Sequence, residues 1–167
     1  MESLFTNKCT YTEENIREMI WAIQKKKFYI CGIGFILILT MLEIQELVEN
    51  GLSIATMIWF VTAIVIGLML YIVPARKAKD TYQRYQIIYH EDLESDTLFY
   101  EEEFLVKTLQ AKAEQKFKYE QIVEVKETLH LYLLMFPKNM AALIEKGGFV
   151  NGNEKDFLRF IENKRKA

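Results

Sequence analysis

Residues 51–75 read GLSIATMIWFVTAIVIGLMLYIVPA, and this stretch decides how the rest of the sequence is interpreted. It contains no Asp, Glu, Lys, Arg or His. A helix needs about 20 apolar residues to cross the ~30 Å hydrocarbon core of a bilayer, and residues 54–73 supply them. Pro74 predicts the end of this helix, because proline cannot continue the helical hydrogen-bond ladder. The stretch therefore predicts a transmembrane helix.

A second apolar run, FYICGIGFILILTML at residues 28–42, is shorter. Extended to Val48 it includes Glu43 and Glu46, which a helix would place toward the outer edge of the bilayer, where a carboxylate is tolerated. A cleaved signal peptide fits poorly, because 27 residues precede the run and no small-residue cleavage site follows it. Together the two runs predict a hairpin over residues 28–75, with spans at about 28–48 and 54–73 and a loop at 46–53.

Basic residues flank both spans, whereas the loop between them has none. The flanking set is Lys25, Lys26, Lys27, Arg76, Lys77 and Lys79. Since Lys and Arg concentrate on the cytoplasmic side of membrane proteins, these residues predict a multi-pass protein of the cell membrane with both termini cytoplasmic. The centres of the spans lack the charged groups that proton relays and ion paths need, which argues against a transporter or channel.

Residues 1–27 form a polar N-terminal arm with one apolar stripe. Thr12 is a suitable N-cap for a helix that begins at Glu13, and residues 4–11 could form a strand. The helical stripe is Ile16, Met19, Ile20 and Ile23. Such a helix either packs on the cytoplasmic domain, lies along the membrane, or binds a partner.

Residues 80–167 change to short runs of alternating polar and apolar residues, which are typical of strands. The predicted strands lie at about 84–90, 97–101, 103–109, 114–119, 122–128, 130–136 and 140–145. Asn153 and Asp156 then form a capping pair for a helix from Glu154 to about Lys164, with Phe157 on its apolar face. The sequence predicts an α+β membrane protein. Its transmembrane hairpin precedes a small pleckstrin-homology-like antiparallel β-barrel, which the C-terminal helix caps. We expect residues 80–167 to fold alone as this domain.

Three segments resemble the YcxB-like family of bacterial membrane proteins. They are TYTEENIREM (Thr10–Met19), FKYEQIVEVKETLHLYLLM (Phe117–Met135) and IEKGGFVNGNEKDFLRFIENK (Ile144–Lys164). The resemblance implies two transmembrane helices and a cytoplasmic C-terminal domain, and it assigns no catalytic residue to this sequence. The family usually shows a proline-lysine-arginine-type step where Ile144–Gly148 stands in this sequence.

The sequence contains no motif that points to an enzyme. His90 and His130 lie 40 residues apart without metal-ligand spacing, which favours no metal and no cofactor. The acidic run at residues 89–103 lacks the glycine and the final glutamate of a calcium loop, and is better interpreted as a solvated turn and strand face. Nucleotide-binding glycine loops and the serine-hydrolase motif are absent from the sequence.

The sequence therefore favours a membrane-anchored, non-enzymatic binding or scaffold module. Two alternatives stay open: a small regulatory or immunity protein that protects against a membrane-active peptide, and an enzyme with an unrecognised site. The net charge of −2 and the pI near 5.8 make nucleic acid an improbable partner. Besides the bilayer, the expected partner is another membrane or cytoplasmic protein, with a homo-oligomer also allowed. Lipid headgroups come second, through a patch of Lys107, Lys112, Lys116 and Lys118.

Overall fold

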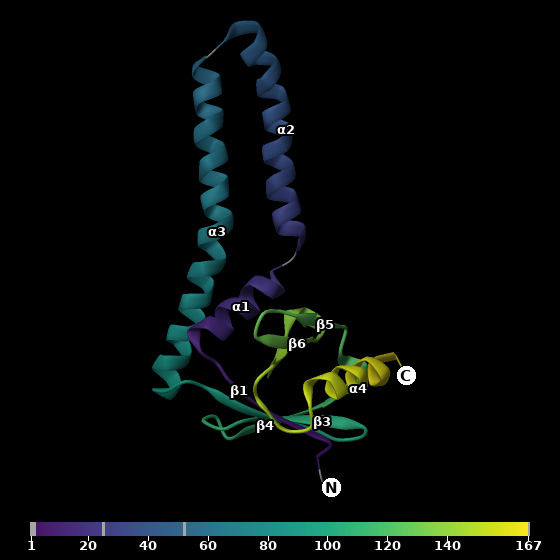
Figure 1. Cartoon of the computed structure of the whole chain (residues 1–167). Coiled ribbons are helices and arrows are strands. Elements are labelled where there is room, and N and C mark those ends of the chain that lie inside the picture. The colour runs from purple at the N-terminus through teal and green to yellow at the C-terminus, as the bar shows by residue number, and fades with distance from the viewer. Residues whose placement is uncertain (1–2, 25, 52, 167) are drawn as a thin grey trace. The chain divides into compact units, whose positions relative to one another are not determined.

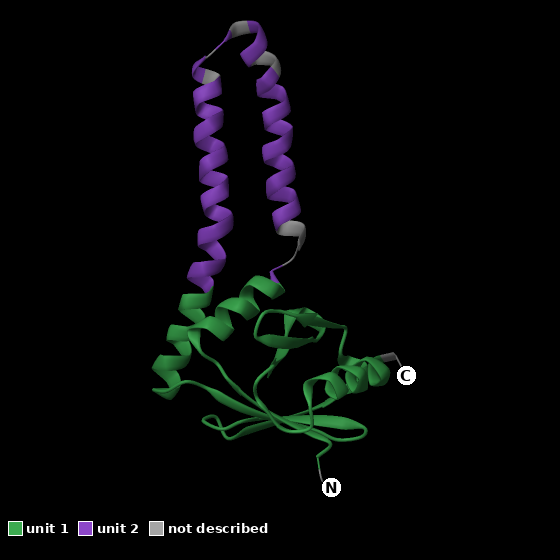
Figure 2. Cartoon of the chain, viewed as in Figure 1, with its two compact units in different colours: residues 1–23, 78–167 green, residues 24–77 purple. Residues whose placement is uncertain are grey.

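The computed structural model describes residues 3–24, 26–51 and 53–166 of the 167-residue chain (Figure 1). The chain divides into two compact units (Figure 2). One unit is residues 24–77, and the other combines residues 1–23 with residues 78–167. The N-terminal arm is thus part of the same unit as the C-terminal domain.

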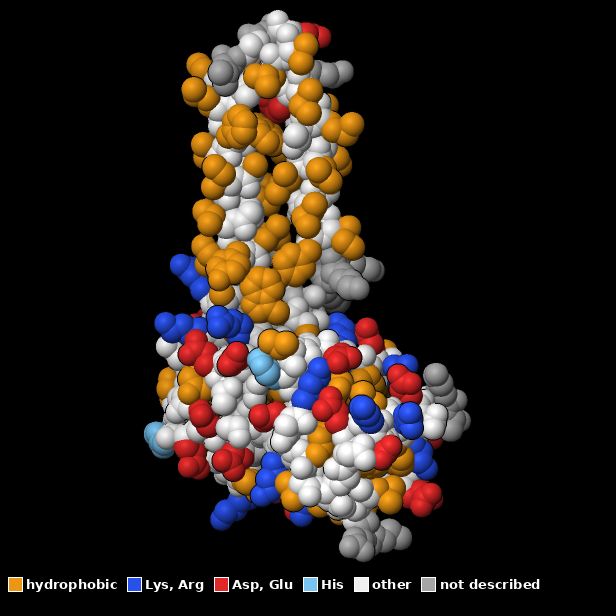
Figure 3. Space-filling view, viewed as in Figure 1, with side chains coloured by type: hydrophobic (Ala, Val, Ile, Leu, Met, Phe, Trp, Pro, Cys, Tyr) orange, Lys and Arg blue, Asp and Glu red, His pale blue; other side chains and the backbone are white. Residues whose placement is uncertain are grey.

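The first unit is a helical hairpin. Helix α2 spans Lys26–Asn50, and helix α3 starts at Ile54 after a short loop. Both helices are long and apolar enough to cross a membrane. Their hydrophobic side chains cover the helix surfaces (Figure 3) instead of packing in a core, since almost none of the apolar windows is buried within the chain.

Helix α3 (Ile54–Tyr89) is longer than the sequence predicts. It runs through Pro74, so the expected stop at this residue is wrong, and it includes most of the strand expected at 84–90, which is also wrong. Ala78, Tyr82 and Tyr85 recur at helical spacing, and they pack in one cluster with Ile16 of the N-terminal helix. This packing stabilises the part of α3 that follows Pro74, although proline removes one backbone hydrogen bond of the helix.

The second unit contains two antiparallel sheets. The first has five strands in the order β4-β3-β2-β1-β8, and the second has three in the order β5-β6-β7. The strands of the first sheet are β1 (Phe5–Thr10), β2 (Glu94–Phe99), β3 (Glu103–Thr108), β4 (Ala113–Lys118) and β8 (Phe149–Asn151). Those of the second are β5 (Glu124–Glu127), β6 (Leu131–Met135) and β7 (Ala141–Glu145). The six strands predicted between residues 97 and 145 are present, with shifted ends.

The N-terminal strand β1 lies inside the first sheet. Phe5 to Thr10 pair with Phe99 to Glu94 of β2, and the other side of β1 pairs with β8. Two segments that flank the hairpin in the sequence therefore share one sheet. A fragment of residues 80–167 would lack this strand, which weighs against the prediction that it folds alone.

The closed barrel predicted from the sequence is wrong, because the two sheets do not join into one. Between β1 and β7, the Asn7 side chain takes the place of strand pairing. Its Nδ2 donates to the carbonyl of Glu145 at 2.7 Å, and its Oδ1 accepts from the Glu145 N–H at 3.0 Å. Between β4 and β5, a 3₁₀ turn at Tyr119–Gln121 redirects the chain into the second sheet.

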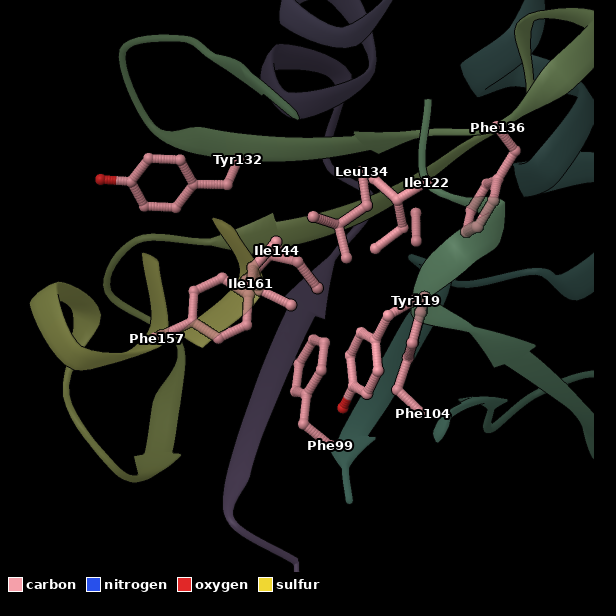
Figure 4. Close-up of a cluster of buried hydrophobic side chains, with 11 residues drawn as sticks. Phe99, Phe104, Tyr119, Ile122, Tyr132, Leu134, Phe136, Ile144, Phe157 and Ile161 are labelled. Atoms are coloured by element: carbon pink, nitrogen blue, oxygen red, sulfur yellow. The ribbon is translucent and has the colours of Figure 1, made fainter. Parts of the chain in front are cut away.

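An aromatic core fills the space between the sheets and the C-terminal helix α4 (Glu154–Lys166). In Figure 4, Phe99, Phe104 and Tyr119 lie together on one side of this core, with Phe157 and Ile161 of α4 on another. Phe157 is fully buried and meets Phe99 edge-on, with 4.8 Å between ring centroids. The predicted cap of α4 forms, since the Asp156 N–H donates to the Asn153 side chain at 2.9 Å.

Helix α1 (Glu13–Ile23) packs on the domain through the predicted stripe. Ile16 and Ile20 are buried, and Met19 and Ile23 pack against the buried leucines of β6. Thr12 caps the helix by accepting the Asn15 N–H at 3.1 Å. Of the three roles left open by the sequence, these contacts support packing on the domain.

Candidate functional site

The two sheets diverge at one end of the domain and leave a cleft of about 590 Å³ between them. Its walls come from β3 and β4 on one side, and from β7 and the turn before it on the other. The apolar part of the lining is Val106, Phe117, Phe136, Met140, Ala141 and Ala142, and the polar part is Tyr11, Thr108, Gln115 and Lys116. Met140 is 56% exposed, so the apolar surface is open to solvent.

Turn geometry puts Met140 at the mouth of this cleft. After β6, the chain turns through Pro137–Asn139, where Lys138 and Asn139 both have positive φ. The Phe136 N–H then donates to the Met140 carbonyl at 2.8 Å, which closes the turn. Phe136 is thereby buried against Phe117, with ring centroids 4.6 Å apart, while Met140 stays exposed.

The β2 strand contributes two buried hydroxyls behind the wall of the cleft. Ser95 and Thr97 are each 1% exposed and pair in register with Thr108 and Val106, which line the cleft. Among the described residues, neither Ser95 Oγ nor Thr97 Oγ1 has a hydrogen-bond partner. Burial raises the pKa of the Tyr11 phenol, which interacts with the Ser95 hydroxyl without reaching hydrogen-bond geometry.

Strand β4 borders the cleft and forms one edge of the first sheet. The Lys118 N–H donates to the Gln121 side chain at 2.9 Å, and therefore points away from β3. Backbone direction alternates along a strand, so residues 113, 115 and 117 pair with β3. The N–H and C=O groups of Glu114 and Lys116 then face the open edge.

The four lysines proposed as a lipid patch do not form a uniformly positive surface. The Lys107 amine lies 2.8 Å from a Glu114 oxygen, and Lys116 lies 3.1 Å from Glu103. The hydrogen bond to Glu114 raises the pKa of Lys107. Lys112 stands in the turn between β3 and β4, and Lys118 ends β4. The register thus interleaves Lys107, Lys116 and Lys118 with glutamates on one sheet face.

The other residues singled out in the sequence are dispersed. His90 is an exposed turn residue with φ of 61°, and the His130 ring nitrogen lies 3.1 Å from Glu18. Within the described part of the chain, His, Cys, Asp and Glu residues form no group that could hold a metal ion. The acidic run contributes Glu101–Glu103 to a second pocket of about 700 Å³ beside Lys116.

The residues that predicted the orientation lie at both ends of the hairpin. Lys26 and Lys27 begin α2, while Lys25 lies outside the described residues. Arg76, Lys77 and Lys79 are exposed residues of α3.

The sequence did not reveal the cleft, because its walls come from strands of both sheets and from Tyr11 before α1. The family comparison covers a large part of the domain. Residues 99–161 match the model of the YcxB-like protein family. This region is YcxB-like, as the sequence resemblance predicted. The YcxB-like region runs from the end of β2 into α4 and includes every residue of the cleft except Tyr11. No match was found among curated proteins or among solved structures.

Proposed function

We propose that this protein is a membrane-anchored, non-enzymatic binding module, whose cytoplasmic domain holds an apolar segment of a partner protein in the cleft between its sheets. The observation that carries the proposal is the open apolar lining around Met140, Phe117 and Ala142. Exposed methionines suit binding of varied apolar side chains, because the thioether side chain is flexible and polarisable.

The same arrangement weighs against an enzyme and against lipid headgroups as the bound partner. An enzyme needs polar groups that converge on a reacting atom, whereas the lining of this cleft is mainly apolar. Lipid headgroups would need surplus positive charge, but Lys107 and Lys116 are already paired with glutamates. A protective role against a membrane-active peptide would use the same cleft, with the peptide as the bound segment.

The proposed anchor is the hairpin of α2 and α3 in the cell membrane, with both termini cytoplasmic. Strand β1 precedes the hairpin in sequence and pairs with β2, which follows it. This pairing supports a location of both hairpin ends on one side of the membrane, and the basic flanks favour the cytoplasmic side.

The architecture of the cytoplasmic domain is part of the same proposal. Its two sheets and C-terminal helix support a pleckstrin-homology-like domain in which the sheets do not close into a barrel.

The test is site-specific photocrosslinking in native membranes. A photoreactive phenylalanine analogue replaces Met140 at the cleft, and in a matched control it replaces Val150, which is 66% exposed on β8. We expect one reproducible protein adduct from position 140, which is absent from position 150. The adduct should disappear when Thr108→Trp fills the cleft.

Each contrary outcome overturns the proposal. Adducts with lipid alone would favour the headgroup alternative. Equal protein adducts from positions 140 and 150, or an adduct that persists with Thr108→Trp, would show that the cleft is not the binding surface. The folded state of Thr108→Trp is checked by circular dichroism of the full chain in detergent.

A further inference from the structure

We propose that two copies of the chain join through the open edge of β4, so that their first sheets form one continuous antiparallel sheet. An unpaired strand edge is a ready template for pairing with another strand. The occupant inferred here is a second copy of the same chain, and the inference does not depend on what the cleft binds.

The backbone of β4 is arranged for self-pairing about a two-fold axis beside Gln115. In this register, Gln115 faces Gln115 of the second copy, and Glu114 faces Lys116 of the second copy. The outward N–H and C=O groups of Glu114 can then exchange both hydrogen bonds with those of Lys116, and the symmetry repeats the exchange. An isologous contact of this kind closes after two copies.

Charge selects this register. Directly opposed side chains of opposite sign stabilise an antiparallel pair, whereas like charges destabilise it. Here Glu114 of each copy faces Lys116 of the other, giving two symmetric pairs of opposite sign. If Lys116 instead faced Lys116, two lysines would meet at the axis.

The other face of β4 also fits in this register. Ala113 faces Phe117 of the second copy, so the smallest side chain of the strand lies opposite the largest. Phe117 is partly buried and Ala113 is exposed. The side chains of β4 that face the cleft would continue onto the second copy, and the two clefts would lie on the same side of the joined sheet.

The ends of β4 oppose longer pairing. Lys118 would face Lys112 of the second copy, which is a contact of like charge. Lys112 belongs to the turn with φ of 47°, and the Lys118 N–H is already bonded to Gln121. The ladder is therefore confined to residues 113–117, which gives a weak association that membrane anchoring would strengthen through high local concentration.

A charge-swap experiment tests the register with the full chain in lipid nanodiscs or proteoliposomes, by energy transfer between labelled copies. Glu114→Lys alone and Lys116→Glu alone should each lose self-association by about tenfold or more, because both pairs become repulsive. The double variant should regain it. A mixture of the two single variants should also associate, since each supplies the charge that the other lacks.

Glu114→Lys and Lys116→Glu each replace an exposed ion pair of the same chain, to Lys107 and to Glu103, with a contact of like charge. Circular dichroism of each variant therefore checks that the domain is folded. Lys118→Glu is the register control, because it should strengthen the association by facing Lys112 with a carboxylate. Unchanged energy transfer in both single variants would place any association elsewhere, for example in the hairpin. That result, failure of the mixture to associate, or weaker association of Lys118→Glu would each overturn the proposal.

A disulfide provides an independent readout. Gln115 would form a non-hydrogen-bonded pair across the axis, with Cα atoms about 4.5 Å apart, within the range of a disulfide. In a Cys31→Ser background, Gln115→Cys should give a covalent dimer under mild oxidation, whereas exposed Lys155→Cys on α4 should not. Equal crosslinking from both positions, or none from position 115, would contradict the proposal.

Discussion

The side chain of Asn7 pairs with the backbone of Glu145 as a neighbouring strand would. Its amide donates to the Glu145 carbonyl and accepts from the Glu145 N–H. Asn7 is fully buried, and Thr10 N–H adds a longer contact of 3.3 Å to the Glu145 carboxylate. One side chain thus connects the two sheets where the backbone ladders do not meet.

Asn7→Ala should lower the free energy of unfolding by roughly 2–4 kcal/mol, because both backbone groups of Glu145 would lose their partner in a buried site. Asn7→Asp should also destabilise, since a carboxylate keeps the acceptor but loses the donor. Thermal unfolding of the full chain in detergent, followed by near-UV circular dichroism, measures the effect. Lys8→Ala is the control, with an exposed side chain and an expected change within about 0.5 kcal/mol. Equal effects at positions 7 and 8 would contradict this account.

The adjacent glycines between β7 and β8 should respond differently to substitution. A Cβ at position 148 would lie 1.9 Å from the carbonyl oxygen of Lys8, whereas a Cβ at position 147 meets nothing within 4 Å. Gly148 also accepts the Lys8 N–H at 2.8 Å, so the collision falls on a strand-pairing contact. Gly148→Ala should cost roughly 1–3 kcal/mol, and Gly147→Ala should be nearly neutral. The same unfolding measurement compares them, and similar melting temperatures would count against the close approach.

A fragment of residues 80–167 should not give a folded domain, because β2 and β8 would lose β1 between them. Residues 1–23 joined by a Gly/Ser linker to residues 78–167 should instead fold without the hairpin. Amide hydrogen exchange of both purified fragments tests this, with strong protection expected in β2 and β6 of the joined fragment alone. A protected, cooperatively melting 80–167 fragment would show that β1 is dispensable.

The contact between α1 and the β5–β6 turn should weaken in acid. Burial raises the pKa of Glu18, but hydrogen bonds from Thr128 and His130 outweigh it and leave the pKa lowered. The His130 N–H donates to Glu18 at 2.8 Å. A carboxyl group whose pKa is lower in the folded than in the unfolded state stabilises the fold. The stabilisation is complete when the pH is above the pKa of the unfolded state, and it is lost as the pH falls through the pKa of the folded state.

Melting temperature measured from pH 7 downward should therefore drop below about pH 4.5, the ordinary value for this carboxyl. Glu18→Gln should lower stability at neutral pH and reduce the drop. Glu14→Gln, at an exposed position of the same helix, should leave both unchanged. A Glu18→Gln profile parallel to that of the unaltered chain would refute the assignment.

Local patterns predicted most of the elements but not how they join. Alternation found the strands between residues 97 and 145, and capping residues found both amphipathic helices. The segment at 84–90 was mistaken for a strand because its tyrosines and isoleucines favour strands locally, while its helical contacts are with α1. The place of β1 depends on partners more than 80 residues away, and the cleft depends on how two sheets diverge. Neither the place of β1 in the sheet nor the cleft produces a pattern in the neighbouring sequence.

The position of β1 between β2 and β8 sets an order for biosynthesis. Its first partner, β2, begins some 80 residues later, beyond both hairpin helices. At about 5–20 residues per second, a ribosome needs roughly 4–16 s to make that stretch. During this interval β1 is a nascent strand without its sheet, while the two apolar helices are synthesised. Completion of the first sheet therefore follows synthesis of the hairpin.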